Sequence, residues 1–186
     1  MATVQAQPAT LDDLARYPGK AELIGGRIVP QMATGRRPNR VAGRTSRSLD
    51  DYAQLIGVGE AYAHNIGFAV SQLPSGRESF SPDASYYRGP FPADPMRFIE
   101  GPPTLAVEVR SKNDYGNAAE VKIAAKREEY FLAGTEVVWD VDTVAETIHV
   151  YRRSAPTVPT TFQRGQVAEA EPAVPGWRVA VDWIFA

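Results

Sequence analysis

The 186-residue sequence contains no cysteine and only two histidines, His64 and His149. The lack of cysteine excludes a disulfide scaffold and a cysteine-ligated zinc site. Two histidines are too few for a histidine-rich metal centre. Any metal chemistry must therefore rest on carboxylates, whose oxygen atoms favour hard ions such as Mg²⁺.

Long hydrophobic runs are also missing. No window approaches the roughly 18 to 20 consecutive apolar residues that a membrane-spanning helix needs. The first ten residues, MATVQAQPAT, carry neither the basic stretch nor the apolar run of a targeting segment. We therefore expect a protein with no membrane association that works in the cytoplasm.

A strong excess of charge of either sign is absent as well. Lys and Arg number 20 against 22 Asp and Glu, which gives a formal net charge of -2. The chain as a whole is thus not the electropositive body expected of a protein that grips nucleic acid by charge alone. Hydrophobic residues make up 44% and charged residues 23%, a normal globular mixture. We expect residues 1–186 to form a single domain.

Hydrophobic periodicity predicts an α/β protein with a mixed β-sheet flanked by helices and an N-terminal β-hairpin. The hairpin signal is Gly25-Gly26 between two apolar runs. The predicted elements are a short helix from residue 11, a hairpin over 21–31, a helix over 38–56, strands over 61–73 and 79–88, a proline-rich exposed loop over 88–103, a buried strand over 104–111, a helix over 118–133, a strand pair over 135–142 and 146–153, and a C-terminal segment with a small strand and an apolar anchor at 183–185.

Three carboxylates lie in or beside apolar strands, where a charged side chain is expected to lower stability. Glu22 opens an apolar strand, Asp83 follows a proline within an aromatic strand, and Glu108 interrupts the apolar run LAVEV. A carboxylate buried in a sheet costs several kcal/mol unless it is paired, hydrogen-bonded or bound to a metal. If the strands of Asp83 and Glu108 are neighbours, the two side chains could share one divalent cation, which would keep both ionised.

A lysine often completes such a site by orienting the nucleophile or by stabilising developing charge. Lys112 lies just past the strand of Glu108, and Arg110 stands two residues after Glu108 where a lysine could be expected. On the following predicted helix, Lys126 lies on an apolar stripe and Lys122 lies at its edge. An inward-facing lysine needs an anionic partner, so Lys126 is the preferred candidate and Lys122 the second.

Several strings carry a resemblance to a known family. In order, they are LDDLARYP, AELIGGRIV, FSPDASYY, LAVEVRSKND, KREEYFLAG, VVWDVD, HVYRR and EPAVPGW. Their order and spacing resemble the Uma-type restriction endonuclease family, a branch of the PD-(D/E)xK nuclease superfamily. The resemblance implies a restriction-endonuclease-like core, dependence on Mg²⁺ with Mn²⁺ as a substitute, DNA as substrate and a homodimer. It also implies Asp83, Glu108 and Lys126 as the catalytic set, with Glu22 as accessory acid.

The sequence departs from the family at particular positions. Ala21 replaces the usual tyrosine before Glu22, Asn39 replaces a frequent histidine, and the segment Ser111-Lys112-Asn113 replaces a serine-proline loop. These departures, with Arg110, favour an alternative function: a catalytically inactive nuclease-fold domain that binds nucleic acid or protein as a homodimer. A structural dimer module with incidental carboxylates is a third interpretation.

A row of arginines accompanies the apolar stripe of the helix predicted over 38–56. Its members are Arg36, Arg40, Arg44 and Arg47. Such a row is most often a solvated helix face. Its functional interpretation is contact with the phosphates of a nucleic acid backbone. Together these observations predict a Mg²⁺-dependent hydrolase of DNA phosphodiester bonds, with a modest and salt-sensitive grip on its substrate.

Overall fold

A computed structural model describes residues 7–186 of the chain. Its centre is a six-stranded sheet with the strand order β11-β10-β9-β8-β6-β3. Strands β8 and β9 run parallel, and the other neighbouring pairs are antiparallel. The strands are β3 (Glu60–Ala63), β6 (Ala84–Tyr87), β8 (Leu105–Val109), β9 (Val137–Asp142), β10 (Thr147–Arg152) and β11 (Ala155–Gln163).

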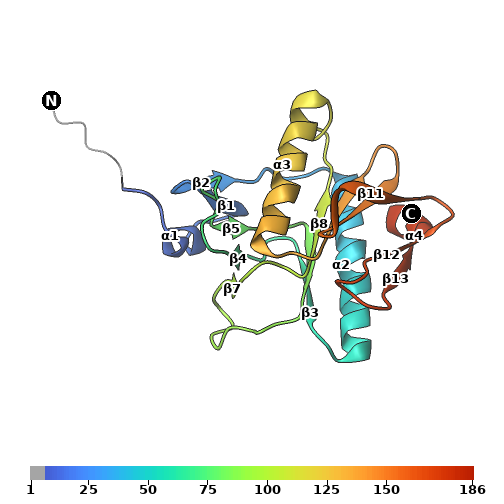
Figure 1. Cartoon of the computed structure of the whole chain (residues 1–186), viewed down its shortest axis with the longest axis horizontal. Helices are drawn as coiled ribbons and strands as arrows, with labels where there is room; N and C mark the ends of the chain where they lie inside the picture. The colour runs from blue at the N-terminus through green and yellow to red at the C-terminus, as the bar shows by residue number, and fades with distance from the viewer. Residues whose placement is uncertain (1–6) are drawn as a thin grey trace.

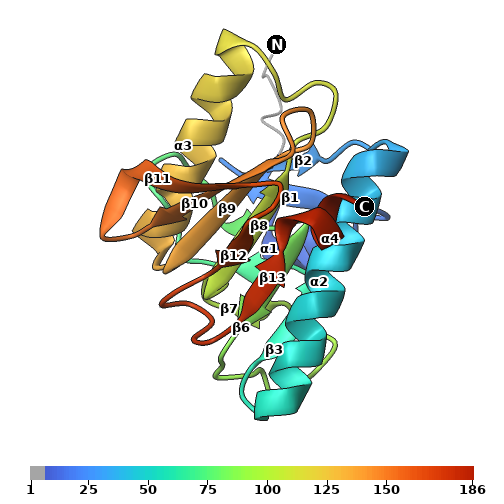
Figure 2. The ribbon, with the colours of Figure 1, turned by 90° about the vertical axis from the view of Figure 1, so that its right-hand side faces the viewer.

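Helices cover both faces of this sheet, as Figures 1 and 2 show. One face packs against α2 (Arg36–Ile56), α4 (Val181–Phe185) and the small sheet of β12 (Val167–Glu169) and β13 (Arg178–Ala180). The other face packs against α3 (Asn117–Ala133) and a three-stranded sheet. That sheet has the order β5-β4-β7, with β5 (Ser79–Phe80), β4 (Phe68–Ala69) and β7 (Ile99–Glu100). The predicted mixed sheet flanked by helices is confirmed.

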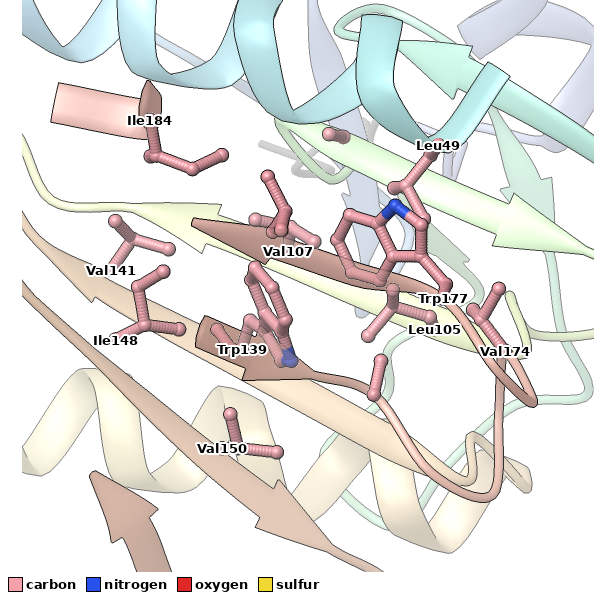
Figure 3. Close-up of a cluster of buried hydrophobic side chains, with 14 of the residues drawn as sticks. Leu49, Leu105, Val107, Trp139, Val141, Ile148, Val150, Val174, Trp177 and Ile184 are labelled. Carbon is pink, nitrogen blue, oxygen red and sulfur yellow. The ribbon is translucent and has the colours of Figure 1, made fainter. Parts of the chain in front are cut away.

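The largest buried cluster fills the space between the central sheet and α2. Trp139 of β9 and Trp177 lie at its centre, with ring centroids 4.9 Å apart, and both side chains are almost fully buried. Figure 3 shows Leu49 of α2 next to Trp177, and Ile184 of α4 in the same cluster. Because side chains alternate along a strand, the apolar residues of β8 that face this cluster leave Glu108 on the opposite face, towards α3.

The parallel pair β8 and β9 is joined by α3, since parallel neighbours need a crossover connection. Gly134 ends α3 with a φ of 117°, and its N–H donates to the carbonyls of Tyr130 and Phe131. A residue without Cβ adopts this conformation readily. The β8–α3–β9 unit thereby brings α3 back over the sheet face that carries Glu108.

Two elements precede the sheet at the N-terminal side. Helix α1 (Leu11–Ala15) begins with a capping box between Thr10 and Asp13. The hairpin of β1 (Ala21–Ile24) and β2 (Arg27–Pro30) turns at Gly25-Gly26, whose φ values of 56° and 67° are those a type I′ turn requires. The predicted short helix and hairpin are both confirmed. None of the helices within residues 7–186 is both long enough and apolar enough to span a membrane.

The strand predicted over 61–73 is wrong as a continuous element. It is divided into β3 and β4, which belong to different sheets, by a turn in which Asn65 has a φ of 80°. The strand predicted over 79–88 is divided in the same way into β5 and β6, and Asp83 lies directly before β6. The loop predicted over 88–103 contains β7, where Ile99 is buried. The anchor predicted at 183–185 holds for Ile184 and Phe185, whereas Trp183 is 41% exposed.

We predict opposite effects for two glycine-to-alanine substitutions. Gly134→Ala should lower the free energy of unfolding by about 1 kcal/mol, because alanine is strained at positive φ. Gly43→Ala, at an exposed site inside α2 with no atom within 4 Å of the added Cβ, should raise it by about 0.5 to 1 kcal/mol. Urea unfolding checks both, and equal effects at the two positions would contradict the role given to Gly134.

Candidate active site

Asp83 is fixed against β8 by its backbone and its side chain. Its N–H donates to the carbonyl of Val107 at 3.0 Å. Its Oδ2 accepts the N–H of Val109 at 2.9 Å. Asp83 is therefore held beside Glu108, the residue between these two β8 partners. Its second oxygen, Oδ1, lies 2.6 Å from the Nζ of Lys20.

Glu108 points from β8 towards α3 and is partly exposed, at 26% of its side-chain area. Its Oε1 accepts the phenol of Tyr130 at 2.6 Å and lies 2.9 Å from the Nζ of Lys126. Burial raises the pKa of the Glu108 carboxyl; the Lys126 ammonium opposes the shift, and the carboxylates of Asp83 and Glu22 add to it. A further cation at this carboxylate would relieve the repulsion.

Lys126 connects two of the acids. Its Nζ lies 2.9 Å from Oε1 of Glu108 and 3.0 Å from Oε1 of Glu22. Burial alone would lower the pKa of Lys126, but the two carboxylates raise it above its usual value. Lys126 is thus held as a permanent ammonium and cannot serve as a general base at neutral pH.

Glu22 is almost fully buried and is surrounded by donors. Oε1 accepts the N–H of Ser81 at 3.0 Å, and Oε2 lies 2.6 Å from Nη1 of Arg77 and 3.3 Å from Nε2 of Gln31. Burial opposes ionisation, but Lys126, Arg77 and the Ser81 N–H together lower the pKa of Glu22 to about 2. The carboxylate is therefore ionised at neutral pH.

All four side chains predicted for the site from the sequence, Glu22, Asp83, Glu108 and Lys126, lie in one charged cluster. The cluster also contains residues that the sequence interpretation missed. They are Lys20, Gln31, Arg77, Glu129 and Tyr130. Two of them carry a usable signal, since Lys20 precedes Glu22 by two positions along a strand and Tyr130 follows Lys126 by one helical turn. No comparable pattern marks Arg77, whose partner Glu22 is 55 residues away.

The other basic candidates lie elsewhere. Arg110 donates two hydrogen bonds of 2.7 Å to Asp140 and also pairs with Glu120, so its guanidinium clamps β8 to β9 and to the first turn of α3. Lys112 and Lys122 are exposed. Neither makes an ion pair within residues 7–186.

The four arginines of the row on α2 differ in exposure and in contacts. Arg36, Arg40 and Arg47 are exposed. Arg44 donates to the carbonyl of Trp183 at 3.0 Å and its guanidinium lies 5.9 Å from the centre of that ring. Arg44 therefore joins α2 to α4, and the remaining three arginines are the members that solvent or a ligand can reach.

The chain matches a known protein family and a solved structure. The model of the Uma2 family, described as "Putative restriction endonuclease", matches residues 9–182. The chain belongs to the Uma2 family. No curated protein matches it significantly. A solved structure from Anabaena variabilis, described as a putative nuclease belonging to DUF820, superposes with a TM-score of 0.74 at 17% identity, covering 96% of this chain and 98% of that one. The fold is therefore restriction-endonuclease-like.

The candidate active site offers oxygen ligands for a divalent cation. Within residues 7–186, no three histidine or carboxylate side chains converge as a ready metal cluster. Two carboxylates are neighbours at the end of β8, those of Asp83 and Glu108, and the charge of Asp83 raises the pKa of Glu108. Mg²⁺ is usually bound by one or two carboxylates, several waters and substrate phosphates, so this donor set fits Mg²⁺ better than an ion that needs an all-protein cage.

The charge of Glu22 should appear in the pH dependence of stability. A carboxyl with a folded pKa of about 2 and a reference value of 4.5 stabilises the folded protein fully above pH 4.5, and this contribution is lost as pH falls towards 2. Glu22→Gln should therefore lower the free energy of unfolding by on the order of 3 kcal/mol at pH 7, and by progressively less at pH 4 and pH 3.

Urea unfolding of both proteins at these pH values measures the difference. Glu128→Gln is the matched control, because Glu128 is exposed on α3. A Glu22→Gln effect that is the same at pH 3 and pH 7 would contradict the assigned pKa.

Proposed function

We propose that this Uma2 protein is a Mg²⁺-dependent endonuclease that hydrolyses phosphodiester bonds in DNA. The observation that carries the proposal is that Asp83 and Glu108 are neighbours at the end of β8, beside the ammonium of Lys126. Paired carboxylates with an adjacent cation suit phosphoryl chemistry, in which negative charge must be stabilised as it develops. Membership of the Uma2 family supports the same reaction class.

In this proposal the carboxylates of Asp83 and Glu108 hold the ion, and Mn²⁺ can replace Mg²⁺. When bound, such an ion supplies Lewis-acid polarisation of the phosphoryl oxygen and lowers the pKa of a bound water. The protein fixes both ligands beforehand. The Val109 N–H orients Asp83, and the Tyr130 phenol orients Glu108.

Lys126 acts as a fixed positive charge. Because its ammonium stays protonated, it can donate a hydrogen bond to the attacking water or to a phosphoryl oxygen. It does not remove a proton. Glu22 acts as a positioning residue: its ion pair with Lys126, together with the Arg77 guanidinium on its other oxygen, keeps that ammonium at the end of β8.

DNA binding requires further cationic contacts. The exposed Arg36, Arg40 and Arg47 of α2 can supply phosphate contacts, which would make binding modest and salt-sensitive. A homodimer would present two active sites and could cut both strands of a duplex in one binding event, so we propose that the protein acts as a homodimer. Its proposed working compartment is the cytoplasm.

The test is cleavage of plasmid and oligonucleotide DNA by purified protein in Mg²⁺ or Mn²⁺. Asp83→Asn, Glu108→Gln and Lys126→Met should each lower the rate by about 100-fold or more, because each removes a charge at the reacting phosphate. Lys122→Met is the matched control, since Lys122 is an exposed lysine one turn earlier on α3. Its rate should equal that of the wild type.

Cleavage that survives Asp83→Asn would overturn the proposal. The second candidate function is a catalytically inactive nuclease-fold module that binds nucleic acid or protein as a homodimer. The observation that favours it is Arg110, which occupies the position of a strand lysine and is fully engaged with Asp140 and Glu120. Salt-sensitive DNA binding without cleavage in either metal would support that alternative.

A further inference from the structure

Lys20 is the one cationic member of the charged cluster to which the proposed reaction gives no role. It directly precedes β1 and stands two residues before Glu22, so both side chains lie on the same side of the hairpin. Its Nζ lies 2.6 Å from Oδ1 of Asp83. The side-chain exposures of Lys20 and Asp83, 21% and 25%, match those of Lys126 and Glu108, 21% and 26%, so exposure does not separate the two ion pairs.

The two oxygens of Asp83 are not equivalent. Oδ2 is held by the N–H of Val109, a rigid donor in the central sheet. Oδ1 is therefore the oxygen best placed to bind a cation, and the ammonium of Lys20 lies on it. A divalent ion binds carboxylate oxygen at about 2.1 Å. Two cations so close to one oxygen would repel each other strongly, so Lys20 and the ion are alternatives at this position.

Lys20 and Lys126 differ in how easily they can leave their partners. Lys126 is bound by two carboxylates, one of them almost fully buried. Within residues 7–186, Lys20 forms one ion pair, with the partly exposed carboxylate of Asp83. A lysine side chain is long and flexible, so the Lys20 amine can swing into solvent without a change in the backbone.

The net charge of the cluster favours a phosphate as the new partner of the displaced Lys20 ammonium. Four carboxylates, Glu22, Asp83, Glu108 and Glu129, face three cationic side chains, Lys20, Arg77 and Lys126, which leaves one net negative charge. A divalent cation reverses that sign to one net positive charge. A phosphodiester, with a single negative charge, then neutralises the cluster, and the freed ammonium of Lys20 has an anion within reach.

We propose that Lys20 is an exchangeable counterion: it competes with the divalent cation for Oδ1 of Asp83, and it moves to a phosphate of the DNA when the cation binds. This inference rests on the proposed function for the identity of the metal ligands. It adds a substrate contact and a control of metal affinity that are both carried by Lys20.

Metal affinity tests the first half without any need for cleavage. Mn²⁺ binding to the full chain is measured by titration calorimetry or by the loss of the free-ion electron paramagnetic resonance signal. Lys20→Met should bind Mn²⁺ about tenfold more tightly than the wild type, because no ammonium has to be displaced. Lys112→Met removes the same charge from an exposed site three residues past β8 and should change the affinity less than twofold.

Equal Mn²⁺ affinity of the wild type and Lys20→Met would overturn the competition. Asp83→Asn separates this failure from failure of the proposed function. If Asp83→Asn leaves Mn²⁺ binding unchanged, the metal assignment itself is wrong. If Asp83→Asn abolishes binding while Lys20→Met has no effect, the metal site stands and the counterion role of Lys20 is wrong.

The second half is tested by the salt dependence of DNA binding in Ca²⁺. A lost phosphate contact lowers the slope of log affinity against log salt by about 0.9. Lys20→Met should show this decrease in Ca²⁺ and no decrease in EDTA, where Asp83 retains the amine. An unchanged slope in Ca²⁺ would overturn the transfer of Lys20 to phosphate.

Discussion

The ammonium of Lys126 holds together two carboxylates that the fold would otherwise be unable to place side by side. Glu22 and Glu108 come from different sheets; Glu22 is almost fully buried, and Glu108 is partly exposed. Without a cation between them, their repulsion and desolvation would expel or protonate one of them. The bridge links α3 to the N-terminal hairpin and to the central sheet, and it helps to keep Glu22 ionised.

The surrounding scaffold keeps that bridge in a defined place. Arg110 binds Asp140 and Glu120, so the end of β8, the neighbouring strand β9 and the first turn of α3 are tied to one guanidinium. On the opposite face, Trp139 packs against Trp177 with the two rings tilted by 30°, and this contact anchors β9 in the largest core cluster. The candidate active site thus lies between a rigid sheet and a helix of which only Tyr130 is deeply buried, and Tyr130 is the residue that orients Glu108.

The two lysines of the site give it one permanent and one exchangeable positive charge. Lys126 pairs with two acids, whereas Lys20 pairs with a single carboxylate within residues 7–186. The difference lies in the number of partners: Lys126 would have to break two ion pairs to leave its position, and Lys20 would have to break one. A protein with a net charge of only -2 can therefore still have a local site suited to a metal ion and a phosphate. The net charge of the whole chain does not show how charges are distributed locally.

The sequence by itself determined which acids are exceptional and which helix carries an inward lysine. Each of the four predicted site residues, Glu22, Asp83, Glu108 and Lys126, interrupts an apolar pattern. A period of two or about 3.6 residues is a local property that can be recognised in the sequence alone. The strand containing Glu108 was predictable for the same reason, and the hairpin turn was predictable from Gly25-Gly26, because glycine readily adopts positive φ. Only the tertiary structure decided which residues pair with each other. Lys20 binds Asp83, Arg77 binds Glu22, and Arg110 binds Asp140. Partners separated by 30 to 63 residues are chosen by how the sheets and α3 pack, because periodicity shows which face is buried but not what lies across from it.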